Sequence, residues 1–148
     1  MLTDLEEAGR SKCFPYFPTS PNDTLTIEDF AITMVEKRRE QGYIISELTL
    51  KRGKESHIIT HFWYREWPDH DVPAGPGGNM AVDTMLSLVL TVRNFRRMLD
   101  EGESPLLVHC SAGVGRTGTY IALDQVPVTT IRIIMHACHY HFAVPLPN

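Results

Sequence analysis

A cysteine and an arginine six positions apart, Cys110 and Arg116, are the residues whose types and spacing most directly suggest chemistry. The residues between them are enough for the backbone to curl so that successive N–H groups point inward and form an anion-binding nest. Arg116 can close such a ring with a planar guanidinium that matches two phosphate oxygens. The same positive field stabilises a thiolate, so the pKa of Cys110 is predicted to fall below the roughly 8.5 of a free thiol. The pattern predicts a nucleophile beneath a bound phosphate.

The loop between these two residues has the composition that such a cradle needs. Gly113 and Gly115 carry no side chain that would obstruct a curled backbone. A lone cysteine is more often a small buried hydrophobe, but the glycines and the flanking apolar segments favour a catalytic interpretation. The candidate phosphate-binding residues are therefore Ser111, Ala112, Gly113, Val114, Gly115 and Arg116.

The same loop fits a second pattern, the G-x-G-x-x-G fingerprint of dinucleotide-binding folds, from Gly113 to Gly118. That fingerprint requires an acidic residue about twenty positions further on, to bind the ribose. Residues 126–148 contain no Asp and no Glu. Arg116 would also obstruct the usual path of a pyrophosphate inside the turn, so a dinucleotide site is rejected.

A candidate acid, Asp69, lies in the run Trp67-Pro68-Asp69-His70. Expulsion of an alkoxide or phenoxide benefits from a positioned carboxylic acid that supplies a proton. Asp69 precedes Cys110 by 41 residues, a separation that one helix and one return strand can span. Pro68 restricts the adjacent backbone, and Trp67 can anchor the base of the loop by burial. Pro-Asp alone is ordinary turn chemistry, so the role depends on the pairing with the cysteine loop.

The elements that would position these residues can be read from residue periodicity. Residues 30–64 are rich in β-branched and aromatic residues, with breaks at 39–42 and 52–54, which predicts an antiparallel meander of three strands. A helix starting at residues 30–35 is the alternative for the first of them. Residues 14–23 hold three prolines and are predicted to be irregular.

The second half of the chain is predicted to supply the helices. Apolar residues at three- and four-residue spacing predict a helix over 79–99. The apolar run 106–108 predicts a short strand buried on both faces, directly before the cysteine loop at 110–118. Residues 119–125 are typical of a helix start, which Pro127 interrupts.

The composition excludes several classes of protein. The 148 residues include 14 Lys and Arg against 18 Asp and Glu, a net charge of −4, which argues against a nucleic-acid binder. No apolar run is long enough to span a bilayer, and the acidic N-terminus is unlike a signal peptide. Three widely spaced cysteines are no disulfide framework and favour a reducing compartment.

Other polar clusters carry weaker signals. A zinc site is disfavoured in the C-terminal segment, because four ligands within six residues can hardly surround one tetrahedral ion: His136, Cys138, His139 and His141. His57 and His61 are expected to flank the sheet rather than to bind metal. The basic run 37–39 is expected to form a solvated turn.

The two motifs together resemble the cysteine-dependent protein tyrosine phosphatases, and are most similar to receptor-type catalytic domains. The resemblance rests on the run from Trp67 to Pro73 and on the run from Val108 to Tyr120. It implies an α/β fold with a central, mixed and highly twisted sheet flanked by helices, here truncated at both ends. Residues 1–125 would be a partial catalytic domain, and 126–148 a divergent tail. Asp71 stands where the family usually has glycine.

The resemblance also implies a role for each matching residue. Cys110 would attack phosphorus, and Arg116 with the 111–116 backbone would bind the phosphate. Asp69 would protonate the leaving tyrosyl oxygen and then act as a base toward water. Further implied roles are hydrolysis of the intermediate for Thr117, support of the thiolate for His109, and substrate binding for Trp67.

The expected function is hydrolysis of phosphotyrosine in proteins through a phosphocysteine intermediate, with no cofactor and no metal. An inactive or weakly active truncated pseudophosphatase that binds phosphotyrosine is the alternative, and a related enzyme acting on lipids or phosphoserine is a third. The expected partners are phosphotyrosine-containing proteins, with no nucleic acid and no membrane segment in this chain. The expected location is the cytoplasm. In a longer form of the protein, this chain would be the intracellular part of a membrane receptor.

Overall fold

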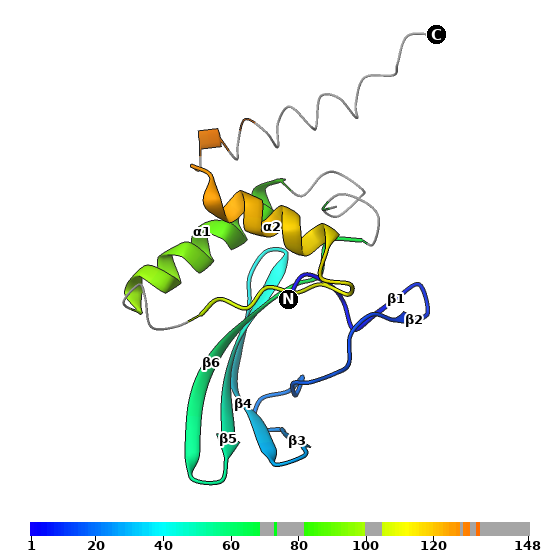
Figure 1. Ribbon diagram of the computed structural model, residues 1–148, viewed down its shortest axis with the longest axis vertical. Coiled ribbons are helices and arrows are strands. Elements are labelled where there is room, and N and C mark those ends of the chain that lie inside the picture. Colours follow the sequence, from blue (N-terminus) through cyan, green and yellow to red (C-terminus); the bar gives the residue numbers. More distant parts are fainter. Residues whose placement is uncertain (69–72, 74–81, 100–104, 128, 131–132, 134–148) are drawn as a thin grey trace.

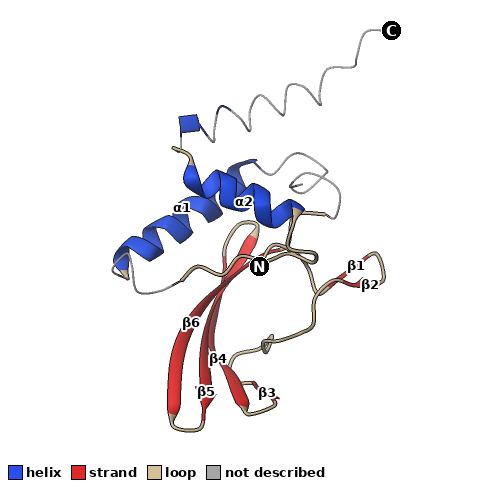
Figure 2. Cartoon of the chain, viewed as in Figure 1, coloured by secondary structure: helices blue, strands red, loops and turns tan. Residues whose placement is uncertain are grey.

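The computed structural model describes residues 1–68, 73, 82–99, 105–127, 129–130 and 133. Two helices lie together at one end of a long twisted sheet, and a small hairpin lies to one side (Figures 1 and 2). Helices and strands form the α/β architecture that the motifs predict. The elements are β1 (Glu6–Glu7), β2 (Arg10–Ser11), β3 (Thr24–Ile27), β4 (Phe30–Arg39), β5 (Tyr43–Arg52), β6 (Glu55–Tyr64), α1 (Val82–Met98) and α2 (Gly115–Gln125).

The predicted meander is confirmed as strands β4, β5 and β6. The sheet has the order β3-β4-β5-β6, and each neighbouring pair is antiparallel, with Ile44 opposite Trp63 in the register of β5 and β6. The helical alternative at 30–35 is wrong, because β4 begins at Phe30. Residues 14–23 contain no strand, as their prolines predict. The sequence did not reveal β3, which adds four residues to the edge of the sheet.

The basic run at 37–39 is not a turn, because it ends strand β4. Its side chains still point to solvent or to polar partners. Lys37 Nζ donates to the Thr19 carbonyl at 2.7 Å, and Arg38 pairs with Glu40 at 2.8 Å. A surface position explains the basic charge without a nucleic-acid partner.

Helix α1 packs on the sheet through the stripe that its periodicity predicts. Met85, Leu86, Val89 and Val92 are all buried, and they share one core cluster with the nucleophile candidate Cys110. Two sheet tyrosines fix the helix by hydrogen bonds across this interface. Tyr43 Oη lies 2.9 Å from the Thr91 hydroxyl, and Tyr64 Oη lies 2.9 Å from the Thr84 hydroxyl. The first three positions of the predicted helix, 79–81, lie outside the described residues.

The predicted buried strand at 106–108 is wrong. Leu107 is 83% exposed, and the segment has no ladder partner among the residues described. A strand needs a neighbouring strand whose backbone groups hydrogen-bond with its own. Next to this segment, the Leu2 amide donates to the His109 carbonyl at 2.8 Å. Tyr64 N in turn donates to Met1 O at 3.0 Å. Residues 1–2 thus join the end of β6 to the residue before Cys110.

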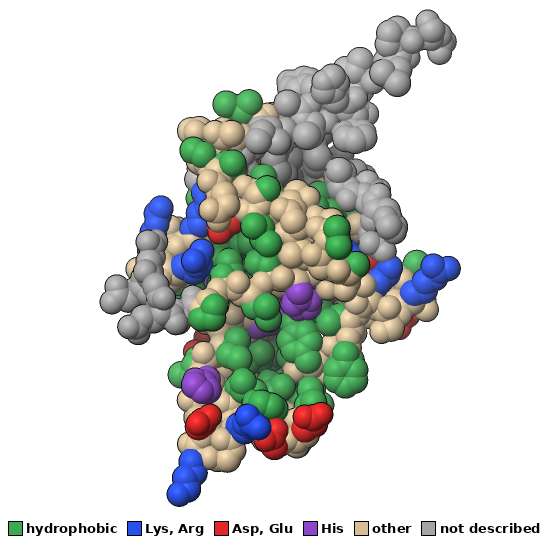
Figure 3. Space-filling view, viewed as in Figure 1, with side chains coloured by type: hydrophobic (Ala, Val, Ile, Leu, Met, Phe, Trp, Pro, Cys, Tyr) green, Lys and Arg blue, Asp and Glu red, His purple; other side chains and the backbone are tan. Residues whose placement is uncertain are grey.

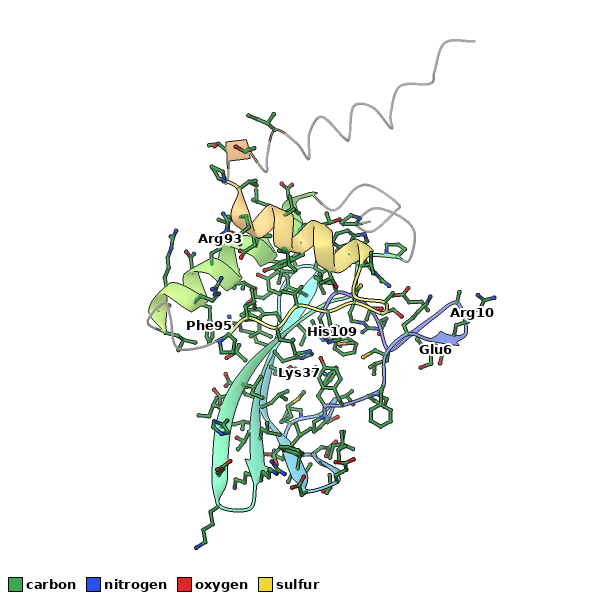
Figure 4. All side chains as sticks on the ribbon, viewed as in Figure 1. Glu6, Arg10, Lys37, Arg93, Phe95 and His109 are labelled. Carbon is green, nitrogen blue, oxygen red and sulfur yellow. The ribbon has the colours of Figure 1, made fainter. Side chains whose placement is uncertain are left out.

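Helix α2 begins earlier and ends where predicted. It starts at Gly115 rather than at 119, because the Gly118 amide already donates to the Val114 carbonyl at 2.9 Å. It ends at Gln125, and Val126 is extended, as the residue before a proline prefers to be. Arg93 of α1 caps this end by donating to three carbonyl oxygens, those of Leu123, Asp124 and Val126 (Figure 4). The two helices are therefore locked together.

The turn between β4 and β5 meets the start of α1 at Gly42. Its φ is +88°, and an added Cβ would lie 2.7 Å from Thr84 Cβ and 2.9 Å from a carboxylate oxygen of Glu66. Gly53, in the next turn, also has positive φ (+58°), but an added Cβ there would meet nothing within 4 Å. Of these two turn glycines, Gly42 is the one that close approach requires.

We expect Gly42→Ala to lower the free energy of unfolding by about 3 kcal/mol and Gly53→Ala by about 1 kcal/mol. Both alanines would be strained in the left-handed region, but only the first adds overpacking, typically 1–3 kcal/mol. Urea unfolding of both variants measures the difference. Equal losses would contradict the close contact between this turn and α1.

Candidate active site

Cys110 lies at the base of an open loop. Its residue is 7% exposed and belongs to the core cluster under α1. The five following residues, 111–115, are all exposed. His109, labelled in Figure 4, places this segment between the helices and the sheet. The sulfur is therefore reached from the loop side while the protein core supports it from below.

The loop needs glycine at one of its two predicted positions. Gly113 has φ +74°, a left-handed conformation that side chains other than glycine's rarely adopt. Gly115 is the first residue of α2, and an added Cβ there would meet nothing within 4 Å. The expectation that Gly115 must also lack a side chain for steric reasons is therefore wrong within the described structure.

The predicted lowering of the Cys110 pKa is confirmed. Burial raises the pKa of this thiol, but the dipoles of the Thr117 hydroxyl and of the Thr117, Gly113 and Val114 amides outweigh burial and lower the pKa to about 7. The Thr117 hydroxyl makes no hydrogen bond of ordinary geometry to any described residue. We therefore interpret its effect as that of a buried dipole near the sulfur.

The source of this stabilisation differs in part from the sequence argument. The curled amides contribute as predicted, and the first turn of α2 supplies the amide and hydroxyl of Thr117. The groups that lower the pKa of Cys110 are thus hydroxyl and amide dipoles, and the Arg116 charge is not among the leading ones. Arg116 has a different set of contacts.

Arg116 is buried, 6% exposed, and its described partners include two acceptors. Its Nη1 donates to Glu7 Oε1 at 2.6 Å and to the Trp67 carbonyl at 2.7 Å. Charge-assisted bonds of this length are among the stronger ones in proteins. They fix the guanidinium direction, and they tie the nucleophile loop to the residue that opens the predicted acid loop.

Glu7 is a site residue that sequence reasoning missed. Its Oε1 also accepts from the Thr3 hydroxyl at 2.9 Å and from the Asp4 amide at 3.2 Å. Burial opposes ionisation, but the hydrogen bond from Arg116 and those from Thr3 and Asp4 lower the pKa of Glu7 below 4.5. Nothing in the local sequence separates Glu7 from the adjacent Glu6, because its partner is 109 residues away.

His109 makes contacts on both ring nitrogens. Nδ1 lies 3.0 Å from the Cys110 carbonyl oxygen, and Nε2 lies 2.7 Å from the Tyr16 hydroxyl. The described contacts of the ring are thus with the backbone of the nucleophile and with a tyrosine. Tyr16 lies in the segment 14–23 that the sequence predicts to be irregular, and its contact with His109 could not be predicted there.

The remaining candidates divide between described and undescribed residues. Trp67 is buried at 6% exposure, as expected for an anchor of the loop base. Asp69 lies outside the described residues, as do the four His and Cys candidates for zinc between 136 and 141. Where side chains are described, no group of three or more His, Cys, Asp or Glu is placed to hold a metal ion. Neither α1 nor α2 has the length and apolar character of a bilayer-spanning helix.

Comparison with known proteins agrees with the geometry. Residues 1–135 match the family model of the protein-tyrosine phosphatases. The chain is 39% identical over 127 residues to receptor-type tyrosine-protein phosphatase C of Rattus norvegicus, covering 84% of this chain and 9% of that protein. It is 40% identical over 126 residues to human receptor-type tyrosine-protein phosphatase H, covering 84% and 11% respectively.

A solved structure of PTPN18 in complex with HER2 phosphopeptides superposes with a TM-score of 0.70 at 31% identity. The match covers 83% of this chain and 42% of that one. The chain belongs to the protein-tyrosine phosphatase family. It spans part of the family's catalytic domain, and about a tenth of the length of the receptor-type relatives.

We expect the pH dependence of Cys110 alkylation by iodoacetamide to have its midpoint near pH 7. Thr117→Ala removes the hydroxyl dipole that favours the thiolate, so the midpoint rises by about one pH unit, equivalent to about 1.4 kcal/mol of preference for the charged form. Thr119→Ala is the matched control, since the Thr119 hydroxyl donates to the Gly115 carbonyl instead. Equal midpoints in the two variants would contradict the role of Thr117.

We expect Glu7→Gln to lower the free energy of unfolding by about 2 kcal/mol at pH 7, because a buried guanidinium loses its counter-charge. The lowered pKa of Glu7 means that its stabilisation is present above about pH 4.5 and is lost as pH falls through the folded value. The difference in the free energy of unfolding between Glu7→Gln and wild type should therefore become smaller as the pH falls below about 4.5. Glu6→Gln, at the exposed neighbour, is the control, and urea unfolding that ranks the two variants equal would contradict the pairing.

Proposed function

We propose that the chain carries the catalytic centre of a protein tyrosine phosphatase that hydrolyses phosphotyrosine through a phosphocysteine intermediate. The observation that carries the proposal is the thiol of Cys110, which is buried beneath an exposed loop and whose pKa is lowered to about 7 by the Thr117 hydroxyl and by the amides of Thr117, Gly113 and Val114. A thiol in that state is substantially ionised at neutral pH, as a cysteine nucleophile requires.

Substrate binding would use the loop amides and Arg116. A phosphate dianion carries oxygens that accept from inward-pointing amides and from a guanidinium. Glu7 and the Trp67 carbonyl hold Arg116 in one direction, so little reorganisation is needed when the phosphate arrives. The backbone of Ser111 to Arg116 is the proposed phosphate site, with Trp67 at its edge.

The first chemical step is attack of the Cys110 thiolate on phosphorus. The S–P bond forms as the P–O bond to tyrosine breaks, and Asp69 supplies the proton that the leaving phenolate takes up. In the second step Asp69 removes a proton from water, water oxygen bonds to phosphorus, and the S–P bond breaks. The Thr117 hydroxyl and the loop amides then stabilise the departing thiolate.

Substrate class and location rest on the relatives. The PTPN18 structure contains phosphopeptides, which supports phosphotyrosine-containing proteins as substrates here. The receptor-type relatives and the free thiols of Cys13 and Cys110 support a reducing, cytoplasmic setting. The domain boundary at residue 125 stays a prediction.

We expect turnover of a phosphotyrosine peptide, with kcat/KM falling as pH drops below about 7, because the protonated thiol does not attack. Cys110→Ser should lower kcat/KM by at least about a thousandfold. The control substrate is the same peptide with phosphoserine in place of phosphotyrosine, which should be hydrolysed more slowly.

Three outcomes would contradict this proposal. Vanadate binding with no turnover would indicate a pseudophosphatase that binds phosphotyrosine. Faster hydrolysis of phosphoinositides or of the phosphoserine peptide would indicate a different substrate class. Turnover that survives Cys110→Ser would exclude the cysteine mechanism.

A further inference from the structure

An apolar groove lies along the edge of the sheet, beside the segment that leads to Cys110. A cavity of about 330 Å³ is lined there by residues of β5, β6 and α1 and by residues 105–108. Hydrophobic side chains gather over this face of the sheet, below the helices (Figure 3). The residues that define this edge groove are Leu48, Leu50, Ile59, Leu106, Leu107 and Val108.

The edge groove exposes apolar surface that carries no charged side chain. Leu107 is 83% exposed, and Ile59 of β6 is 41% exposed. Among the described residues that line the groove there is no Lys, Arg, Asp or Glu. Contiguous apolar surface of this kind marks a place where another segment or a partner binds. Whatever covers the groove should therefore be apolar and uncharged.

The backbone beside the groove can pair with an extended segment. Residues 106–108 have no partner strand among the residues described, and β6 is the last strand of its sheet. At one end of the groove, residues 1–2 already lie between β6 and His109 and are hydrogen-bonded to both. Unpaired strand backbone accepts an added strand, whose alternate side chains then enter the groove. The groove therefore suits a segment with apolar side chains at every second position.

The C-terminal part of this chain contains a segment with that pattern. Histidine, alanine and proline alternate there with larger apolar side chains, which recur at Cys138, Tyr140, Phe142, Val144 and Leu146. A period of two is typical of a strand that buries one face. Residues 138–146 also contain no Lys, Arg, Asp or Glu, so the segment matches the groove in charge as well as in period.

The segment is long enough to reach the groove. Tyr120 of α2 lines the groove, and α2 ends at Gln125, about 8 Å further along the helix axis. Residues 126–137, which follow, can span up to about 40 Å when extended. Residues 134–148 lie outside the described residues, and the family match ends at residue 135. The family model therefore assigns the segment no role.

We propose that residues 138–146 of this chain bind in the edge groove as an added strand, with Tyr140, Phe142 and Val144 against its apolar lining. The backbone of the segment pairs with that of residues 106–108, and His139 and His141 face water. The segment covers the apolar surface that the described part of the fold leaves exposed. This interaction goes beyond the proposed function and does not depend on the chemistry of Cys110.

Hydrogen–deuterium exchange of the whole chain tests the proposal at the amides of residues 106–108. In wild type these amides should exchange at least about tenfold more slowly than in an unstructured peptide. Phe142→Asp would bury a charge, so it should release the segment and remove that protection. His141→Asp is the matched control, since the next side chain along the segment faces water, and it should keep the exchange rates within about twofold of wild type.

A substitution in the groove gives the reciprocal test. Leu107 is 83% exposed, so Leu107→Asp leaves the core of the described fold intact. It should raise the exchange rates of the amides of residues 139–144 about tenfold, because a charge then faces the apolar side of the segment. Phe14→Asp is the control, because Phe14 is 68% exposed and does not line the groove.

Three results would overturn the proposal. The first is a wild-type chain whose amides at 106–108 exchange as fast as in an unstructured peptide. The second is equal exchange in Phe142→Asp and His141→Asp. The third is protection that disappears on dilution together with a dimer seen by sedimentation, which would assign the groove to a second copy of the chain. None of these results changes the alkylation of Cys110, which tests the proposed function separately.

Discussion

The structure depends on holding a negative charge on a sulfur that is mostly out of water. Burial alone would keep Cys110 protonated, and the dipoles of Gly113, Val114 and Thr117 reverse that effect. Those dipoles converge only if the chain turns sharply after Cys110 and enters a helix at once. Gly113 supplies the turn with its positive φ, and α2 begins at Gly115. The conformation of the loop is therefore what allows the Cys110 thiol to ionise.

Arg116 extends this requirement to the rest of the fold. Its bonds to Glu7 and to the Trp67 carbonyl join three parts of the chain: the N-terminal hairpin, the segment that follows β6 and the first turn of α2. Residues 1–2 add a second connection, from β6 to His109. A substrate that binds the loop therefore contacts a residue already held by two separate elements.

Much of the arrangement could be predicted from the sequence where the signal is local. The meander of β4, β5 and β6, the apolar stripe of α1 and the cysteine loop each follow from spacing within a short window. Contacts between distant residues could not be predicted. Glu7 is indistinguishable from Glu6 until Arg116 is folded beside it, and Tyr16 gains its role only beside His109.

The error at 106–108 has the same origin as these omissions. Three apolar residues in a row are typical of a buried strand. A buried strand also requires neighbouring strands, and the residues of the segment alone cannot predict whether those neighbours are present. Leu107 lies exposed because no described strand pairs with it.

The central claim is that Cys110 is a thiolate at neutral pH, stabilised by amide and hydroxyl dipoles. The most direct test is the ultraviolet absorbance of the thiolate near 240 nm, recorded against pH as the difference between wild type and Cys110→Ser. The account predicts a single rise with its midpoint near pH 7. A midpoint at the value of a free thiol, roughly 8.5 or above, would contradict it.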